Sequence, residues 1–206
     1  MSEAISFFVI EDHSLTNLGI RQILSEKAAL VCKGFAAEKS EAFEKLTELD
    51  MKGQLPKILI LDLFLGEYSG IDILREVSFH FPAIKTIVYS MYSNPGVISI
   101  VMREGAKAFV SKAGSEAELL KAVNTVASGG TYIQEDLVAS LDIYQNLLDS
   151  LMKSEQNVFT KVIERKTKAQ IAEELEISES SVENYLSRIF AKTGCKSVDE
   201  LVKQFG

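Results

Sequence analysis

Residues 58–62 read ILILD and residues 5–12 read ISFFVIED, so each is a short apolar run that ends in a carboxylate. Such runs, rich in β-branched and aromatic side chains, predict strands that are buried on both faces of a sheet. Three further runs have the same character, at residues 30–35, 86–89 and 108–110. Apolar residues at helical spacing lie between the runs. Five strand–helix pairs predict an α/β fold over residues 1–128, a doubly wound five-stranded parallel sheet with helices on both faces.

Length and composition are those of a folded globular protein. The chain has 206 residues, of which 47% are hydrophobic and 25% are charged, and these values argue against disorder and coiled coils. No apolar stretch approaches the roughly 20 residues that span a bilayer, and the N-terminus carries Glu3 without a basic segment. The distant Cys32 and Cys195 are typical of reduced thiols. We therefore expect a cytoplasmic protein with no membrane segment and no secretory signal.

The last part of the chain has a different character. Gly129-Gly130 interrupts the helical pattern, and we interpret residues 129–150 as a partly helical linker. Residues 151–206 lack a strand pattern and predict a small all-α domain of three or four helices, in which residues 174–178 form the tight connection of a helix-turn-helix. Helix starts are marked by capping boxes, Thr167 with Gln170, Ser197 with Glu200 and, as an open alternative, Ser180 with Glu183.

The net charge of −7 is unevenly distributed. Residues 1–150 hold 13 Lys and Arg against 20 Asp and Glu, whereas residues 151–206 hold 9 of each kind. An acidic first part argues against nucleic-acid binding by that part. The zero net charge of residues 151–206 says less about nucleic-acid binding, because the local placement of cations matters more than their sum.

Charged side chains follow the predicted strands at the point where each strand ends. Glu11 and Asp12 end the first run, and Asp62 ends the third. In a doubly wound sheet these two strands can be neighbours, so three carboxylates would gather at the edge where such sheets bind ligands. Like charges at close range are costly unless a cation joins them, and Mg²⁺ prefers carboxylate, water and phosphate oxygens. The sequence therefore predicts a Mg²⁺ site.

Two further polar residues belong to the same edge. Ser90 follows the fourth run and Lys112 follows the fifth. Taken singly, an Asp at a strand end is often a helix cap, and a Lys there is commonly solvated. The coincidence of five such positions favours a phosphate-handling site, in which the carboxylate of Asp62 attacks phosphorus while Mg²⁺ and Lys112 neutralise the oxygens.

Residues 5–128 resemble the receiver domain of bacterial two-component response regulators. The segment VIEDHSLTNLGIRQIL at 9–24 is similar to the opening of the NarL/FixJ subfamily. Asp62 with Gly70 eight residues later matches the phospho-acceptor loop of that family. GAKAFVSK at 105–112 matches its fifth-strand segment, which ends in a Lys. The resemblance implies that the chain is not an enzyme beyond Mg²⁺-dependent phosphorylation and dephosphorylation of itself.

The resemblance also implies a role for each residue of the site. Asp62 accepts a phosphoryl group from a cognate sensor histidine kinase, and Lys112 contacts the phosphoryl oxygens. Ser90 and Phe109 are the implied switch residues, which couple phosphorylation to packing and to a homodimer. The implied Mg²⁺ ligands are Glu11, Asp12, Asp62 and the backbone carbonyl of Phe64.

Several positions depart from the family pattern. Leu65-Gly66 stands where Met-Pro is common, which leaves the stiffness of this loop open. Phe64 and Tyr92 are bulky at positions that flank the phosphoryl group in receivers, and we hypothesise that they hinder attack by water and lengthen the phosphorylated lifetime. For His13 we favour a role in positioning the loop over one as a metal ligand.

A pattern of core and turn positions runs through the last part of the chain, at Leu151, Glu155, Val158, Phe159, Ile171-Ala172, Leu175, Ile177-Ser178, Val182, Ile189, Lys192 and Gly194. In this pattern residues 151–206 resemble the LuxR-type helix-turn-helix domain, with a recognition helix expected at about 179–192 and double-stranded DNA as the implied partner. Asn can read adenine, Glu can accept from cytosine, and Arg favours guanine or phosphate. Glu183, where the family commonly has Lys, and Arg165, where it has the turn Gly, predict a weak intrinsic affinity that dimerisation would raise. The expected DNA contacts are Lys168, Ser181, Glu183, Asn184, Ser187, Arg188 and Lys192.

Three functions compete on this sequence. The first is a transcription regulator switched by phosphorylation. The second is a phospho-dependent protein-binding regulator whose helical tail does not bind DNA, and Glu183 and the neutral tail favour it. The third is a small phosphatase with an Asp nucleophile, but such enzymes also use a second carboxylate two residues later, where this chain has Phe64.

Overall fold

The computed structural model describes residues 5–28, 30–66 and 68–205, and these form two compact units. Met1–Tyr92 and Val101–Gln134 belong to the first unit. Ser93–Ile100 and Glu135–Gly206 belong to the second.

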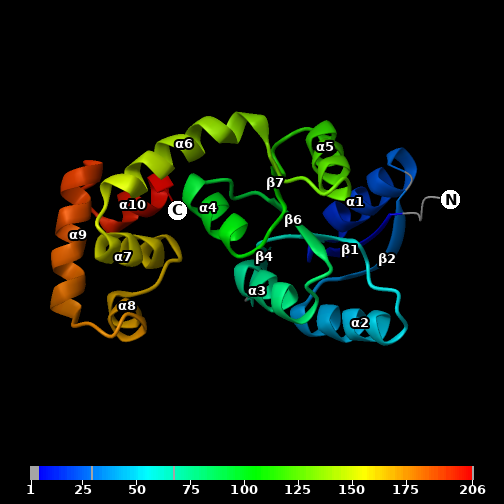
Figure 1. Ribbon diagram of the computed structural model, residues 1–206, viewed down its shortest axis with the longest axis horizontal. Coiled ribbons are helices and arrows are strands. Elements are labelled where there is room, and N and C mark those ends of the chain that lie inside the picture. The colour runs from blue at the N-terminus through cyan, green and yellow to red at the C-terminus, as the bar shows by residue number, and fades with distance from the viewer. Residues whose placement is uncertain (1–4, 29, 67, 206) are drawn as a thin grey trace. The chain divides into compact units, whose positions relative to one another are not determined.

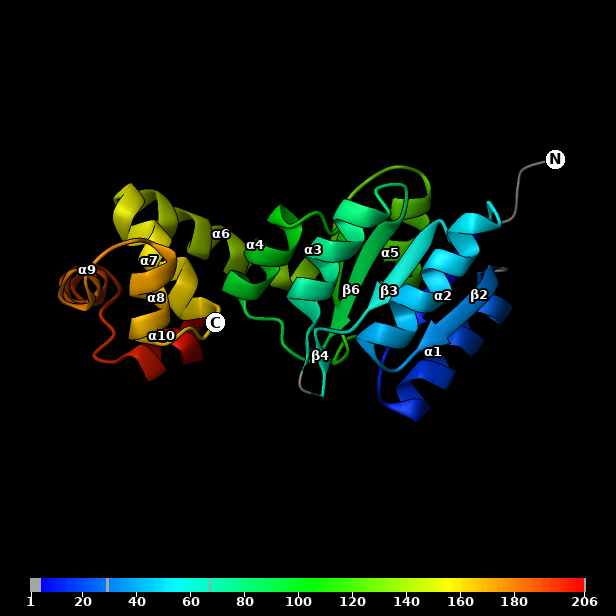
Figure 2. The same cartoon turned by 90° about the horizontal axis from the view of Figure 1, so that it is seen from below.

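A parallel sheet forms the centre of the first unit, in the order β2-β1-β3-β6-β7-β8. The five predicted runs are confirmed as strands. Figure 2 shows β2, β3 and β6 in this sheet with helices before and behind it. The strands are β1 (Ser6–Ile10), β2 (Val31–Ala36), β3 (Ile58–Leu61), β6 (Lys85–Ser90), β7 (Ala108–Ser111) and β8 (Tyr132–Ile133).

Helices cover both faces of the sheet, with α1 and α5 on one side and α2 and α3 on the other (Figure 1). Alternate strand residues such as Phe7 and Val9 form one core with Leu24 of α1 and Val123 of α5. This two-sided burial explains why the strands read as continuous apolar runs. The helices are α1 (Ser14–Lys27), α2 (Lys39–Met51), α3 (Gly70–His80), α4 (Pro95–Arg103) and α5 (Glu116–Ala127), and β4 (Phe64–Leu65) and β5 (Tyr68–Ser69) form an antiparallel hairpin before α3.

The sixth strand corrects two predictions, because the sheet was expected to have five strands and residues 129–150 were expected to be a linker. β8 pairs with the outer edge of β7, where the Gln134 N–H donates to Phe109 O at 3.1 Å. The side chain of Gln134 is 5% exposed, and its Oε1 accepts from the Ser111 N–H at 2.9 Å. These bonds satisfy backbone N–H and C=O groups of β7 that would lack hydrogen-bond partners if β7 were the edge strand.

The second unit contains α6 (Glu135–Ser150), α7 (Lys153–Ile163), α8 (Lys168–Glu174), α9 (Glu179–Thr193) and α10 (Val198–Phe205). Most of the expected linker is thus the single helix α6. Tyr144 of α6 is 1% exposed, and its ring lies 5.7 Å from that of Phe159 and 6.2 Å from that of Phe205, measured between centroids. This aromatic cluster makes α6 a part of the core of the second unit.

The predicted helix-turn-helix is present as α8 and α9. Thr167 and Gln170 form the predicted capping box, but α9 is capped by Ser178, whose hydroxyl accepts from the Ser181 N–H at 3.1 Å. The alternative of Ser180 with Glu183 is therefore wrong. Arg165, at the expected glycine position, adopts a left-handed conformation with φ of 61°. Among the helices of the described residues, none has both the length and the apolar character needed to cross a membrane.

Candidate functional site

The carboxylates of Glu11 and Asp62 meet because β1 and β3 are neighbours in register. Ile10 pairs with Leu61, and the Asp62 N–H donates to Ile10 O at 3.0 Å, so the two acids leave adjacent strands side by side. Both are buried, at 2% and 4% exposed. The predicted gathering of strand-end carboxylates is thus found at this edge of the sheet.

Lys112 bridges the two acids from the end of β7. Its Nζ lies 2.7 Å from Asp62 Oδ2 and 2.6 Å from Glu11 Oε2. Burial disfavours the charged ammonium, but the bonds and charges of Asp62 and Glu11 outweigh burial and raise the pKa of Lys112. Lys112 is therefore a fixed positive charge beside the Asp62 carboxylate.

The acidic cluster carries more negative than positive charge. The ammonium of Lys112 is shared by Glu11 and Asp62, and Asp12 adds a third carboxylate. Glu11, Asp12, His13 and Asp62 each bring one ligand atom to within 4.8 Å of the others. An excess of hard carboxylate donors fits Mg²⁺. The imidazole of His13 contacts Asp12 Oδ1 at 2.8 Å, which holds the loop between β1 and α1.

The two expected switch residues are fully buried, and the aromatic pair lies at the surface. Ser90, at the end of β6, accepts a bond from the Tyr92 N–H through its Oγ at 3.3 Å. Phe109 lies in β7, between Val88 of β6 and Ile133 of β8. Phe64 begins the β4–β5 hairpin, and its ring stacks on that of Tyr92 with centroids 4.1 Å apart.

The helix-turn-helix exposes Glu183, Asn184, Ser187 and Arg188 on α9. Lys168 Nζ lies 2.8 Å from Glu183 Oε1, so two expected DNA contacts pair with each other. Ser181 contacts the hydroxyl of Ser178 within the helix cap.

Lys192 pairs with groups of its own unit, although its side chain remains 35% exposed. Its Nζ lies 2.6 Å from the buried Glu155 and donates to Ser150 O at 2.9 Å. Because the ammonium ties α9 to α7 in this way, the structure gives no support to the expected phosphate contact by Lys192.

Comparison with known families agrees with both units. The family model described as "Response regulator receiver domain" matches residues 7–124, which is more than half of the chain, and the model of the bacterial luxR family of regulatory proteins matches residues 149–205. The protein belongs to the response regulators. It joins a receiver domain to a LuxR-type DNA-binding domain, as the sequence predicts.

Individual relatives of this response regulator match over nearly the full length. The oxygen regulatory protein NreC of Staphylococcus haemolyticus is 30% identical over 95% of this chain and 94% of its own, and NreC of Staphylococcus aureus is 29% identical over the same shares. A solved structure of RcsB of Salmonella enterica serovar Typhimurium, bound to a promoter with a phosphomimetic, has a TM-score of 0.70 at 22% identity and covers 98% of each chain. That likeness shows the shared fold.

Sequence reasoning missed two features of the response regulator. Gln134 and β8 lie beside Phe109, and the β-branched residues after Gly129-Gly130 are the local signal for this strand. Glu155, 1% exposed, was expected only as part of the LuxR-type pattern, and its pairing with Lys192 was missed because no local signal marks it.

Proposed function

We propose that this response regulator is a transcription regulator switched by phosphorylation of Asp62. The observation that carries the proposal is the buried pairing of Asp62 with Lys112 and Glu11, in a chain that also contains a LuxR-type domain. A buried carboxylate held 2.7 Å from a charged ammonium is preorganised to accept an anionic phosphoryl group.

The chemical step is a phosphoryl transfer to the Asp62 carboxylate. One oxygen of Asp62 attacks phosphorus, a P–O bond forms, and the P–N bond to the histidine of the kinase breaks as the imidazole leaves with its electron pair. The Leu63 N–H holds Asp62 Oδ1 at 2.7 Å, so the carboxylate keeps one orientation during the attack. Lys112 neutralises the charge that the three phosphoryl oxygens bring.

Mg²⁺ fits the remaining part of the site. The residues that would hold it are Glu11, Asp12, Asp62 and the backbone carbonyl of Phe64. When bound, the ion would supply further positive charge against the oxygens of the phosphoryl group. The excess of negative charge supports this assignment, because the ammonium of Lys112 is shared by Glu11 and Asp62 while Asp12 adds a third carboxylate.

Ser90 and Phe109 couple the phosphorylation of Asp62 to a change in packing. The phosphoryl group adds about −1.5 to −2 charges and three acceptor oxygens, to which the Ser90 hydroxyl can donate. Movement of Ser90 changes the space beside Phe109, which alters the surface of α4 and α5 and favours a symmetric dimer. We propose no catalysis beyond the protein's own phosphorylation and dephosphorylation.

The output we propose is binding to double-stranded DNA by a homodimer in the cytoplasm, under a cognate sensor histidine kinase. An NreC relative and DNA-bound RcsB structures support this class of output. A second function, phospho-dependent binding of a protein, is favoured by one observation. Lys168 and Lys192, both expected to contact phosphates, are held by carboxylates of their own unit.

The deciding experiment measures DNA binding by the full-length protein with and without beryllofluoride and Mg²⁺. A pool of random duplexes at two salt concentrations is enriched for bound sites. We expect a palindromic site whose affinity rises with beryllofluoride, because the dimer engages two half-sites at once. The variant Asp62→Asn should take up no phosphoryl group and show no beryllofluoride effect.

Two other results would contradict the proposal. Persistent phosphoryl labelling of Asp62→Asn would refute the acceptor assignment. A dimer that forms with beryllofluoride but enriches no duplex would replace DNA by a protein as the partner.

A further inference from the structure

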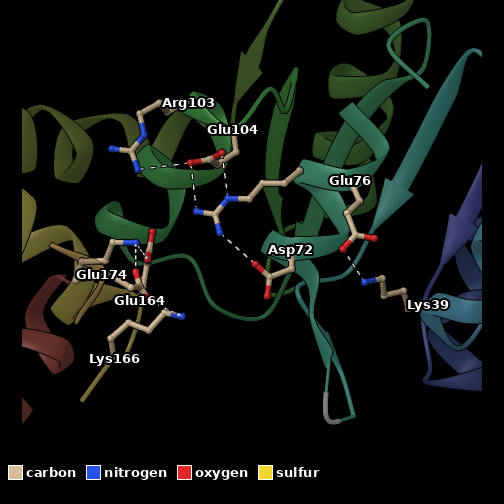
Figure 3. A network of polar contacts seen from close by, with 10 residues as sticks. Lys39, Asp72, Glu76, Arg103, Glu104, Glu164, Lys166 and Glu174 are labelled. Carbon is tan, nitrogen blue, oxygen red and sulfur yellow. Dashed lines mark hydrogen bonds and ion pairs between the residues drawn. The ribbon is translucent and has the colours of Figure 1, made fainter. Parts of the chain in front are cut away.

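Several cations of the second unit are already paired with carboxylates of the same unit. Lys161 and Lys166 lie 2.6 and 3.2 Å from oxygens of Glu174, and Figure 3 shows Lys166 beside this carboxylate. Lys192 is held by the buried Glu155. Residues 151–206, which have zero net charge and pair several cations internally, present a weak positive field to DNA.

The pair between Lys168 and Glu183 differs from these in its position. Lys168 begins α8 and Glu183 lies on the exposed side of α9, so the pair joins the two helices of the helix-turn-helix. In this motif the second helix enters the major groove and the first crosses the phosphate backbone. The side chains are 48% and 61% exposed, so their mutual attraction contributes little to stability.

We infer that Glu183 limits the DNA affinity of this protein by occupying the ammonium of Lys168, which would otherwise neutralise a backbone phosphate. The inference rests on the proposed function, because it concerns the same DNA surface. A phosphate must displace the Glu183 carboxylate before it can contact Lys168, and the carboxylate is itself repelled by the backbone. The bond from Lys168 also lowers the pKa of Glu183, which keeps this carboxylate charged.

The inference has a quantitative signature in the salt dependence of binding. Each phosphate that a cation neutralises releases counterions and adds about −0.9 to the slope of log affinity against log salt concentration. A lysine that is neutralised within the protein adds little to this slope. Release of Lys168 should therefore steepen the slope by about 0.9, which is a further loss of about 3.5-fold in affinity between roughly 50 and 200 mM salt.

The test compares full-length variants on one labelled duplex by fluorescence anisotropy across this salt range. Glu183→Gln keeps the size and polarity of the side chain and removes its charge. We expect several-fold tighter binding at low salt and a slope steeper by about 0.9 for each bound protomer.

Two further variants separate a freed lysine from a general change of charge. In the wild-type background Lys168→Gln should change affinity little, whereas in the Glu183→Gln background it should reduce the gain to that of removing one negative charge elsewhere on α9. Glu179→Gln removes the same charge from the same helix without breaking the pair. Its gain should be smaller and independent of Lys168.

Distinct outcomes overturn the inference and the proposed function. The inference alone is overturned if Lys168→Gln leaves the affinity gain of Glu183→Gln intact. It is also overturned if Glu183→Gln leaves the salt slope unchanged. A changed sequence preference without a change in slope also overturns it, because Glu183 would then be a base contact. If no variant binds any duplex while beryllofluoride still produces a dimer, DNA binding itself is refuted.

Discussion

Phe64 and Tyr92 each follow a polar residue of the site, Asp62 and Ser90, by two positions. Their rings contact each other with centroids 4.1 Å apart and remain 46% and 43% exposed. Large half-exposed aromatic side chains gain little from burial, so we expect this ring pair to act by keeping water from the acceptor. Hydrolysis of an aspartyl phosphate requires a water molecule beside phosphorus, and two stacked rings restrict its approach.

We expect Phe64→Asn combined with Tyr92→Ala to hydrolyse the phosphorylated form several-fold faster than the wild type, because water gains access to phosphorus. Decay of phosphoryl label in purified protein measures the rate. Phe79→Ala removes another exposed aromatic ring, 80% exposed at the end of α3, and should leave the rate unchanged. Equal decay in the double variant and the wild type would show that the rings do not exclude water.

At the scale of elements, α7 and α9 are tied by Lys192 and the buried Glu155. The Lys192 bond, the Met152 N–H and the nearby charge of Arg188 lower the pKa of Glu155, although burial acts in the opposite direction. A carboxylate whose pKa is lower in the folded state stabilises the fold above its ordinary pKa, and this stabilisation is lost as the pH falls through the folded-state value.

Lys192→Met should therefore lower the free energy of unfolding of the second unit by about 1–3 kcal/mol at neutral pH, because it removes a charged partner from a buried carboxylate. The difference from wild type should shrink as the pH falls below about 4.3, where Glu155 becomes protonated in unfolded chains. Thermal unfolding at neutral pH and at a pH below about 4.3 measures the loss of stability and its dependence on pH. Lys203→Met removes an exposed cation of α10 and serves as the control, and an equal loss at both pH values would exclude the Glu155 pair as its cause.

At the scale of the whole molecule, an acidic receiver is joined to a neutral DNA-binding domain. Such a chain gains little long-range attraction to DNA, so two protomers are needed to supply enough contacts. Arg188, exposed on α9, is the expected cationic contact that forms no ion pair within 4 Å among the described residues.

Arg188→Ala should weaken binding at every salt concentration and lower the salt slope by about 0.9 for a bound monomer and about 1.8 for a bound dimer. Salt titrations with and without beryllofluoride measure both slopes. A decrease in slope that is twice as large with beryllofluoride as without it indicates that both protomers of the dimer contact the duplex. An unchanged slope in both states would exclude Arg188 from the interface.

The prediction that Glu11, Asp62 and Lys112 lie close together is confirmed, because all three lie at strand ends. Glu11, Asp62 and Lys112 each follow a short apolar run, and parallel strands bring their carboxyl ends to one edge whatever the intervening helices do. β8 was not predicted from the sequence, because a strand of two residues has no periodic pattern. Its backbone pairs only because β7 offers an open edge.

By itself, the sequence determined the alternation of strands and helices, the meeting of Asp62 with Lys112, and the order of an α/β part followed by an all-α part, since these depend on local periodicity and chain order. The tertiary structure decided which charges are neutralised. Lys168 and Glu183 are 15 residues apart, and Lys192 and Glu155 are 37 apart, so no local pattern marks either pair. Electrostatic attraction depends on distance in space, and packing of α7, α8 and α9 sets those distances.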